Sequence, residues 1–94
     1  MIQVFQAEWC PFSAMVRERL TELGVDYVIR QVEPQRGDRA KLREISGQES
    51  IPVVVLEDDT VLAGETEEII AKLNDHFDAW EWEDGHLDQA RAHA

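Results

Sequence analysis

The stretch Trp9-Cys10-Pro11-Phe12-Ser13 decides the fold, because it separates a short β-prone segment from the first helical pattern in the chain. Upstream of it, residues 2–6 read IQVFQ and are β-prone. Downstream, apolar residues recur at helical spacing and predict one buried helix face, formed by Phe12, Val16, Leu20 and Leu23. We therefore predict a strand, a tight loop that holds the cysteine, and a helix.

Alternating helix and strand signals continue along the chain. Gly24 follows the last apolar position of the first helix, where a left-handed C-cap usually requires glycine. Residues 26–32 are again β-prone, and the stretch Pro34-Gln35-Arg36-Gly37 breaks this strand before a second helix at about 38–46. The first half of the chain is therefore predicted to run β-α-β-α.

The second half adds a hairpin and a helix. Residues 52–56 and 60–62 are predicted to pair as antiparallel strands across a turn at Asp58-Asp59. After Gly64, helical spacing joins Ile69, Ile70, Leu73, Phe77 and Trp80. The order β-α-β-α-β-β-α predicts an α/β fold of the thioredoxin type, with a four-stranded mixed sheet and helices on both faces.

Composition limits the classes of partner. The 94 residues are 44% apolar, which suits one compact core, and the net charge is −11. Residues 1–56 hold 7 Lys/Arg and 8 Asp/Glu, whereas residues 57–94 hold 2 and 12. Such a charge repels phosphate backbones and anionic lipids, so we expect no nucleic-acid or membrane partner. A solubilising surface and a site for a basic protein partner both remain open.

The expected compartment is the cytoplasm. No window approaches the roughly 18 consecutive apolar residues of a membrane span, and residues 1–5 lack the pattern of a signal peptide. The single cysteine excludes an internal disulfide, and a free thiol is typical of a reducing compartment.

Cys10 lies at the predicted start of a helix, where free backbone N–H groups and the helix dipole favour thiolate over thiol. Pro11 suits the first helical turn, because its missing N–H costs nothing there. The hydroxyl of Ser13 can point back and donate a hydrogen bond to the sulfur. The alternative is a buried cysteine that acts only as a small apolar residue.

Two further segments are candidate binding sites. In Ser50-Ile51-Pro52, a cis peptide bond would leave the backbone groups of Ile51 free to pair with an extended ligand, although an ordinary proline at a strand start is equally consistent. In Gly64-Glu65-Thr66, Glu65 could bind an ammonium group, and the N–H and hydroxyl of Thr66 a carboxylate. Plain capping of the following helix is the alternative there.

Together, these three segments resemble the glutaredoxin family and, almost as closely, the thioredoxin-like N-terminal domain of glutathione transferases. The resemblance runs from about residue 2 to residue 77 and implies a glutaredoxin-like domain over residues 1–80. Residues 81–94 are polar and acidic, and we expect an extension that is either frayed or a short fourth helix docked by its tryptophans. The resemblance implies Cys10 and Ser13 as catalytic residues. It also implies a substrate site for a small thiol, formed by Trp9, Pro11, Phe12, Ile51, Pro52, Gly64, Glu65 and Thr66.

Three positions depart from that pattern. Ala7 stands where glutaredoxins usually carry a lysine, Glu8 follows it, and Glu49 occupies a position that is basic in many relatives. We expect the two carboxylates to raise the pKa of Cys10 and to weaken binding of anionic glutathione. These departures favour another low-molecular-weight thiol, or a cationic protein, over glutathione as the substrate.

With one cysteine, the predicted function is monothiol exchange on mixed disulfides of proteins and a low-molecular-weight thiol such as glutathione, with no resident cofactor. One alternative is a glutathione-dependent [2Fe-2S] carrier, against which Pro11 counts because cluster-binding relatives usually have glycine or serine there. Another is a noncatalytic adaptor that binds a partner through Trp80 and Trp82. The histidine spacing matches no metal motif, so we predict no metal site.

Overall fold

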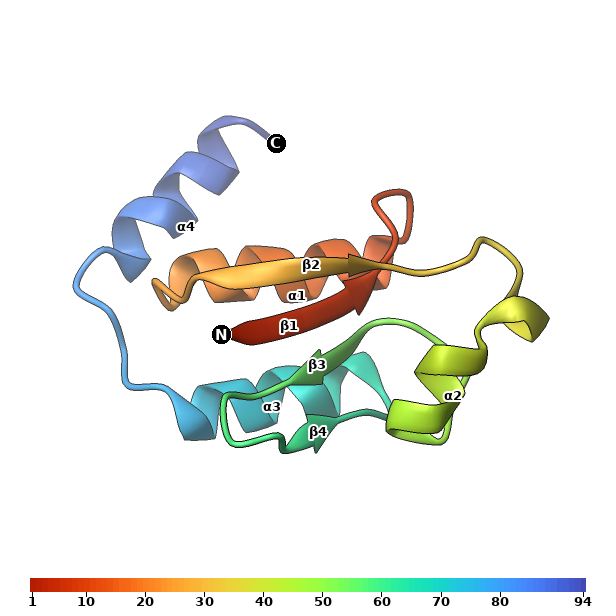
Figure 1. Ribbon diagram of the computed structural model, residues 1–94. Coiled ribbons are helices and arrows are strands. Elements are labelled where there is room, and N and C mark those ends of the chain that lie inside the picture. Colours follow the sequence, from red (N-terminus) through yellow and green to blue (C-terminus); the bar gives the residue numbers. More distant parts are fainter.

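The computed structural model describes all 94 residues as a four-stranded sheet packed against helices (Figure 1). The strands are β1 (Ile2–Gln6), β2 (Tyr27–Gln31), β3 (Val53–Val55) and β4 (Val61–Leu62). The helices are α1 (Pro11–Glu22), α2 (Ala40–Ser46), α3 (Thr66–His76) and α4 (Glu83–Ala92), with a single 3₁₀ turn at Arg36–Asp38. The chain therefore follows the predicted β-α-β-α-β-β-α order, with α4 added after it.

The strands lie in the order β2-β1-β3-β4, so β1 and β3 occupy the centre of the sheet. β1 runs parallel to β2, with Ile2 opposite Tyr27, and antiparallel to β3, with Val4 opposite Val54. β4 pairs antiparallel with β3. The parallel pair needs the α1 crossover, whereas the β3–β4 pair needs only a tight turn. The predicted mixed sheet is confirmed.

Alternation along the strands divides the core between the two faces of the sheet. On one face, Val4 and Val54 join a buried cluster with Val16 and Leu20 of α1 and with Ile69 of α3. The opposite face carries a smaller cluster, which α2 covers. It is formed by Phe5, Leu42, Val53 and Val55. Helices therefore cover both faces, and the loops that follow β1 and precede β3 emerge at the same end of the sheet.

Two predictions about the helices are wrong, one on a buried residue of α1 and one on the end of α3. Phe12 was assigned to the buried face of the first helix, but its side chain is 53% exposed, and Ser13 is buried in its place. The helical pattern after Gly64 was extended to Trp80, yet α3 ends at His76 and Phe77 is already extended, with φ −113° and ψ 137°. Trp80 therefore belongs to the connection between α3 and α4.

The connection and α4 pack at the end of α1 that lies away from Cys10 (Figure 1). The indole of Trp80 lies over Gly24, whose φ is +69°, and a Cβ at that glycine would come within 2.4 Å of the ring. The guanidinium of Arg19 in α1 donates to Glu83 at 2.7 Å. A short fourth helix is thus docked by one of the two predicted tryptophans, because Trp82 is exposed. None of the helices has the length and apolar character needed to cross a bilayer.

Candidate active site

Cys10 is the N-cap residue of α1, with an extended backbone at φ −81° and ψ 119°. Pro11 opens the helix, and the backbone N–H of Ser13 donates to the Sγ of Cys10 at 3.4 Å. The hydroxyl oxygen of Ser13 accepts the backbone N–H of Ala7 at 3.4 Å, which ties the helix start to the loop after β1. The sulfur therefore occupies the position that a capping oxygen usually fills.

The pKa of Cys10 is lowered from its ordinary value. Burial raises this pKa, because only 6% of the residue is exposed, but several other influences outweigh it. Hydrogen bonds from the hydroxyl and the N–H of Ser13 and from the N–H of Phe12 stabilise the thiolate, and the positive charge of Arg39 adds to them. The lowered pKa favours the thiolate more than a purely apolar core position would.

The expected rise in the Cys10 pKa is therefore wrong, because both carboxylates invoked for it are paired with arginines. Glu8 lies 3.6 Å from the guanidinium of Arg17, and Glu49 lies 3.3 Å from that of Arg43. In each pair, the positive charge of the arginine counteracts the effect of the neighbouring carboxylate on the sulfur. Neither carboxylate is among the groups that shift the thiol pKa.

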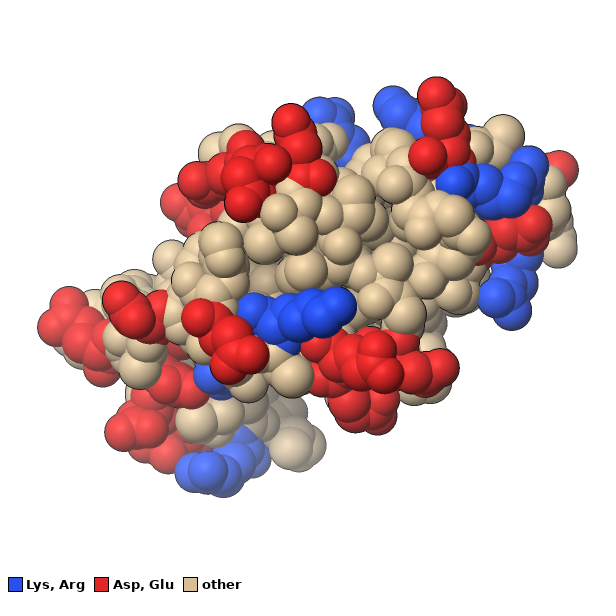
Figure 2. Space-filling model, turned by 90° about the horizontal axis from the view of Figure 1, so that it is seen from below, with Lys and Arg blue, Asp and Glu red and all other residues tan.

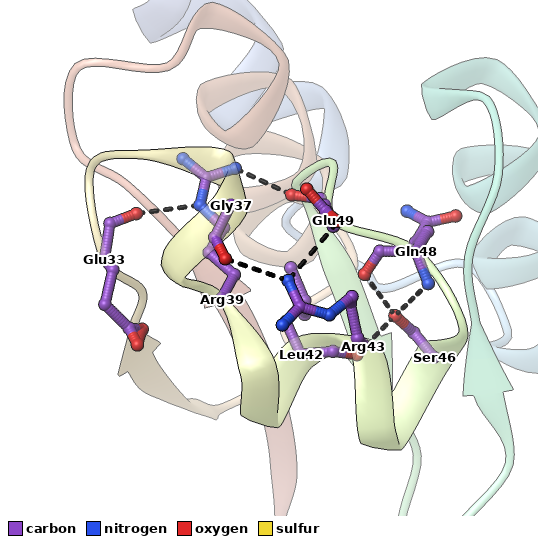
Figure 3. A network of polar contacts seen from close by, with 8 residues as sticks. All are labelled: Glu33, Gly37, Arg39, Leu42, Arg43, Ser46, Gln48 and Glu49. Carbon is purple, nitrogen blue, oxygen red and sulfur yellow. Dashed lines mark hydrogen bonds and ion pairs between the residues drawn. The ribbon is translucent and has the colours of Figure 1, made fainter.

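Arg39, which sequence reasoning missed, is the cation whose charge lowers the thiol pKa, with a smaller effect than the hydrogen bonds from Ser13 and Phe12. It is only 3% exposed, and its guanidinium donates to the backbone carbonyls of Glu33 at 2.7 Å and Glu49 at 2.8 Å (Figure 3). It also donates to the carbonyl of Pro34 at 3.1 Å. A signal was present, because Arg39 precedes the buried Leu42 by three positions and so shares its helix face. The residue joins the loop after β2 to the loop before β3.

Ile51 and Pro52 are joined by a cis peptide bond. Pro52 is buried, whereas Ile51 is half-buried and its backbone N–H and C=O form no hydrogen bond within the chain. The cis alternative considered for this segment is confirmed. The free backbone groups of Ile51 form a short edge that an extended ligand could pair with.

Glu65 and Thr66 begin α3 without capping it through a side chain. Glu65 is the N-cap residue, and its carboxylate forms no capping hydrogen bond. The backbone N–H groups of Thr66 and Glu67 donate to no group in the chain. Free N–H groups at the start of a helix bind anions, and the adjacent Glu65 carboxylate can bind a cation.

Two adjoining cavities bring most of the predicted binding residues together, and they share a common wall of Phe12, Arg36, Ser50 and Ile51. The first has a volume of about 290 Å³ and extends to Trp9, Pro34 and Arg39. The second, of about 320 Å³, extends to Gly64, Glu65, Thr66 and Glu67. Arg36 is a second cation that the sequence analysis did not assign to the site.

Four of the predicted site residues line neither cavity: Cys10, Pro11, Ser13 and Pro52. Cys10, Ser13 and Pro52 are buried, and Pro11 is exposed at the helix start. Trp9 is 67% exposed, which makes it the most accessible aromatic ring at this end of the molecule. In Figure 2, acidic side chains spread over much of the face seen from below, and a group of Lys and Arg lies at the end where Figure 1 places α2.

The glutaredoxin family model matches residues 2–61, which cover β1 to the start of β4 and include the Cys10 and Ile51-Pro52 segments. The chain belongs to the glutaredoxin family. This glutaredoxin-family chain is also 27% identical over 73 residues to an uncharacterized glutaredoxin-like 8.6 kDa protein in the rubredoxin operon of Clostridium pasteurianum. That match covers 78% of the chain and 96% of the relative.

Solved structures place the same glutaredoxin-family chain among thioredoxin-like folds. A glutathione transferase homologue from Sulfitobacter with bound glutathione superposes with a TM-score of 0.71 at 20% identity, over 82% of this chain and 37% of the other. Glutaredoxin 2 from Salmonella typhimurium in complex with glutathione gives 0.67 at 19% identity, over 78% and 32%. The chain thus spans about a third of these two larger proteins, and at such identities the likeness shows the fold.

Proposed function

We propose that this chain is a monothiol thiol–disulfide oxidoreductase that acts on mixed disulfides between proteins and a low-molecular-weight thiol. The observation that carries the proposal is the Cys10 sulfur at the N-terminus of α1, where hydrogen bonds and Arg39 lower its pKa. It is the only cysteine in the sequence, so the exchange partner of its disulfide must be another molecule.

The proposed reaction has two exchange steps. In the first, the Cys10 thiolate attacks the small-thiol sulfur of the mixed disulfide, the protein–small-thiol S–S bond breaks, and the protein thiolate leaves and takes a proton from solvent. In the second, another small thiolate attacks the small-thiol sulfur now bonded to Cys10. This step releases a small-molecule disulfide and regenerates the Cys10 thiolate. The two electrons that reduce the target protein come from the two small thiols.

The surrounding groups support this chemistry. The N–H groups of Ser13 and Phe12 and the charge of Arg39 stabilise Cys10 both as the attacking thiolate and as the leaving group. The backbone of Ile51 can pair with the peptide part of the small thiol. Glu65 can hold an ammonium group while the free N–H groups of Thr66 and Glu67 hold a carboxylate.

Glutathione is the first small thiol to test. Two structures with the same fold contain it, and the two cavities together offer arginines for one end of a zwitterionic peptide and a helix start beside a carboxylate for the other. The acidic Glu65 and Glu67 make this site less favourable for anions than a purely basic one. Protein targets with basic surfaces around their mixed disulfide would complement the net charge of −11.

The test is reduction of the mixed disulfide of glutathione and 2-mercaptoethanol by reduced glutathione, with the parent chain and with Cys10→Ser. We expect the parent to turn over the disulfide and the variant to retain at most about 1% of that rate, because no other sulfur can attack. Mass spectrometry of the parent after exposure to oxidised glutathione should show one adduct, on Cys10. Equal rates for the two proteins would refute the mechanism.

A further inference from the structure

Gln48 joins two of the segments that line the proposed thiol site. Its side-chain Nε2 donates to the carbonyl of Ser50 at 3.0 Å, and its Oε1 accepts the backbone N–H of Gly64 at 2.9 Å. Ser50 leads directly into Ile51, and Gly64 leads into the start of α3. One amide group therefore contacts the chain on both sides of the cavity that Ile51 and Thr66 line.

The backbone of Gln48 is itself held in place by the end of α2. Its N–H donates to the hydroxyl oxygen of Ser46 at 3.2 Å, and that hydroxyl donates to the carbonyl of Leu42 at 2.7 Å (Figure 3). Gly47 between them is the left-handed C-cap of the helix, with φ +76°. The side chain of Gln48 thus projects from a well-ordered helix end rather than from a free loop.

No other hydrogen bond sets the distance between these two segments. Gln48 is the only partner of the Gly64 N–H and of the Ser50 carbonyl. The ladder between β3 and β4 pairs Val54 with Leu62, so it stops before it reaches either segment. Beyond that point, the Gln48 amide is the direct polar link between the Ile51 edge and the first turn of α3.

We propose that Gln48 is a positioning residue, which holds the Ile51 edge and the N-terminus of α3 at the spacing that lets one small-thiol molecule contact both. This inference rests on the proposed function, because it concerns binding of the same thiol. Gln48 does not take part in the exchange itself. It forms no hydrogen bond with Cys10 or with any of the groups that lower the thiol pKa.

A positioning role predicts a selective effect on substrate binding. Gln48→Met keeps the length of the side chain and removes both hydrogen bonds, whereas Gln48→Glu keeps an oxygen for the Gly64 N–H and loses the donor for the Ser50 carbonyl. Gln3→Met is the matched control, because Gln3 accepts one side-chain hydrogen bond from Arg30, at 2.8 Å, and lines neither cavity.

The measurement is reduction of the mixed disulfide of glutathione and 2-mercaptoethanol by reduced glutathione. We expect Gln48→Met to raise KM about tenfold and Gln48→Glu about threefold, as the loss of two and of one hydrogen bond implies. The value of kcat and the midpoint of the pH profile for alkylation of Cys10 should stay at those of the parent. Gln3→Met should leave all three unchanged.

Amide exchange adds a readout that does not depend on catalysis. The Gly64 N–H should exchange with D₂O faster in Gln48→Met than in the parent or in Gln3→Met, because its only acceptor is gone. Unchanged exchange at Gly64 overturns the inference, as does an unchanged KM, or a KM that rises together with a shifted Cys10 midpoint. Failure of the proposed function looks different, because the parent and Cys10→Ser would then have equal rates.

Discussion

The two ends of helix α1 are built from similar residue types and serve different purposes. At the N-terminal end, the groups around Cys10 are left without partners in the chain: the backbone of Ile51, the first N–H groups of α3 and the exposed rings of Trp9 and Phe12. At the C-terminal end, the charged and polar side chains around Arg19 bond to one another, and a cavity of about 520 Å³ lies beside them between Gly24, Trp80 and His86. The two ends therefore differ in whether their polar groups are already paired within the chain.

Arg19 and Arg39 make the contrast concrete. Arg19 donates to three side chains: Asn74 at 2.7 Å, Glu22 at 2.9 Å and Glu83 at 2.7 Å. The two carboxylates neutralise its positive charge locally. Arg39 donates only to neutral carbonyls, and its charge remains to act on the thiolate. The partners of each arginine therefore decide whether it only links segments of the chain or also changes the pKa of a nearby group.

Replacement of Arg39 should have the largest effect at either end. Arg39→Met leaves three carbonyls without a donor, so we expect the free energy of unfolding to fall by about 3 kcal/mol. It also removes a positive charge that lowers the pKa of Cys10, so that pKa should rise. Urea unfolding and the pH profile of alkylation by iodoacetamide measure the two effects.

The direction of the pH dependence follows from the lowered pKa. The folded chain releases the Cys10 proton at lower pH than the unfolded chain does, so the free energy of unfolding rises as the pH rises through the folded pKa. Arg39→Met should reduce that rise. Arg36→Met, which removes an exposed arginine of the same site, should leave stability nearly unchanged. Equal losses in the two variants would contradict the role given to Arg39.

At the other end of α1, Gly24→Ala should cost about 2 kcal/mol of unfolding free energy. The substitution imposes a side chain on a left-handed backbone and pushes its Cβ into Trp80. Gly47→Ala has the same kind of backbone but open space around it, so it measures the backbone cost alone. Thermal unfolding monitored by circular dichroism compares the two variants.

Two further measurements sharpen this prediction. Gly85→Ala, inside α4 with open space around it, should be neutral or stabilising, because alanine is the better helix former. The pH profile for alkylation of Cys10 should be the same in Gly24→Ala as in the parent, because the substitution lies at the opposite end of α1 from the thiol. A shifted profile would mean that the two ends are coupled, against the comparison drawn above.

The smallest effect is expected from Glu8→Gln. Because the Glu8 carboxylate is exposed and screened by solvent, the alkylation midpoint of Cys10 should move by less than about 0.3 pH units. Arg17→Met should raise that midpoint slightly, and by the same amount in the Glu8→Gln background, because the contributions of the two charges at the sulfur add. Unequal rises in the two backgrounds would show that Arg17 acts by another route.

Local patterns predicted most of the fold. Strand β1 has the expected bounds, and Gly24 has the expected left-handed backbone, because both follow from signals within a few residues. The end of α3 was missed because Phe77 and Trp80 keep helical spacing while the backbone turns away at Phe77. Beyond that turn, Trp80 packs over Gly24, a residue more than fifty positions earlier in the chain that helical spacing alone does not reveal.

The site was predicted in its segments and missed in its electrostatics. Cys10, Ile51 and Thr66 were identified because each occupies a recognisable place at the start of a helix or strand. The direction of the Cys10 pKa was missed because Coulomb reasoning counted Glu8 and Glu49 without the arginines that pair with them. The influence of Arg39 depends on carbonyls that only the folded chain brings to its guanidinium.

The burial of Arg39 also has a consequence for how the protein meets changes in its medium. At physiological ionic strength, dissolved ions screen the attraction between surface charges that lie more than about 8 Å apart. They screen a charge enclosed by backbone carbonyls much less. Any attraction between the acidic exterior and a basic protein should therefore weaken as salt rises, while the thiol pKa changes less. Salinity should then alter the surface interactions of the chain more than the chemistry of its sulfur.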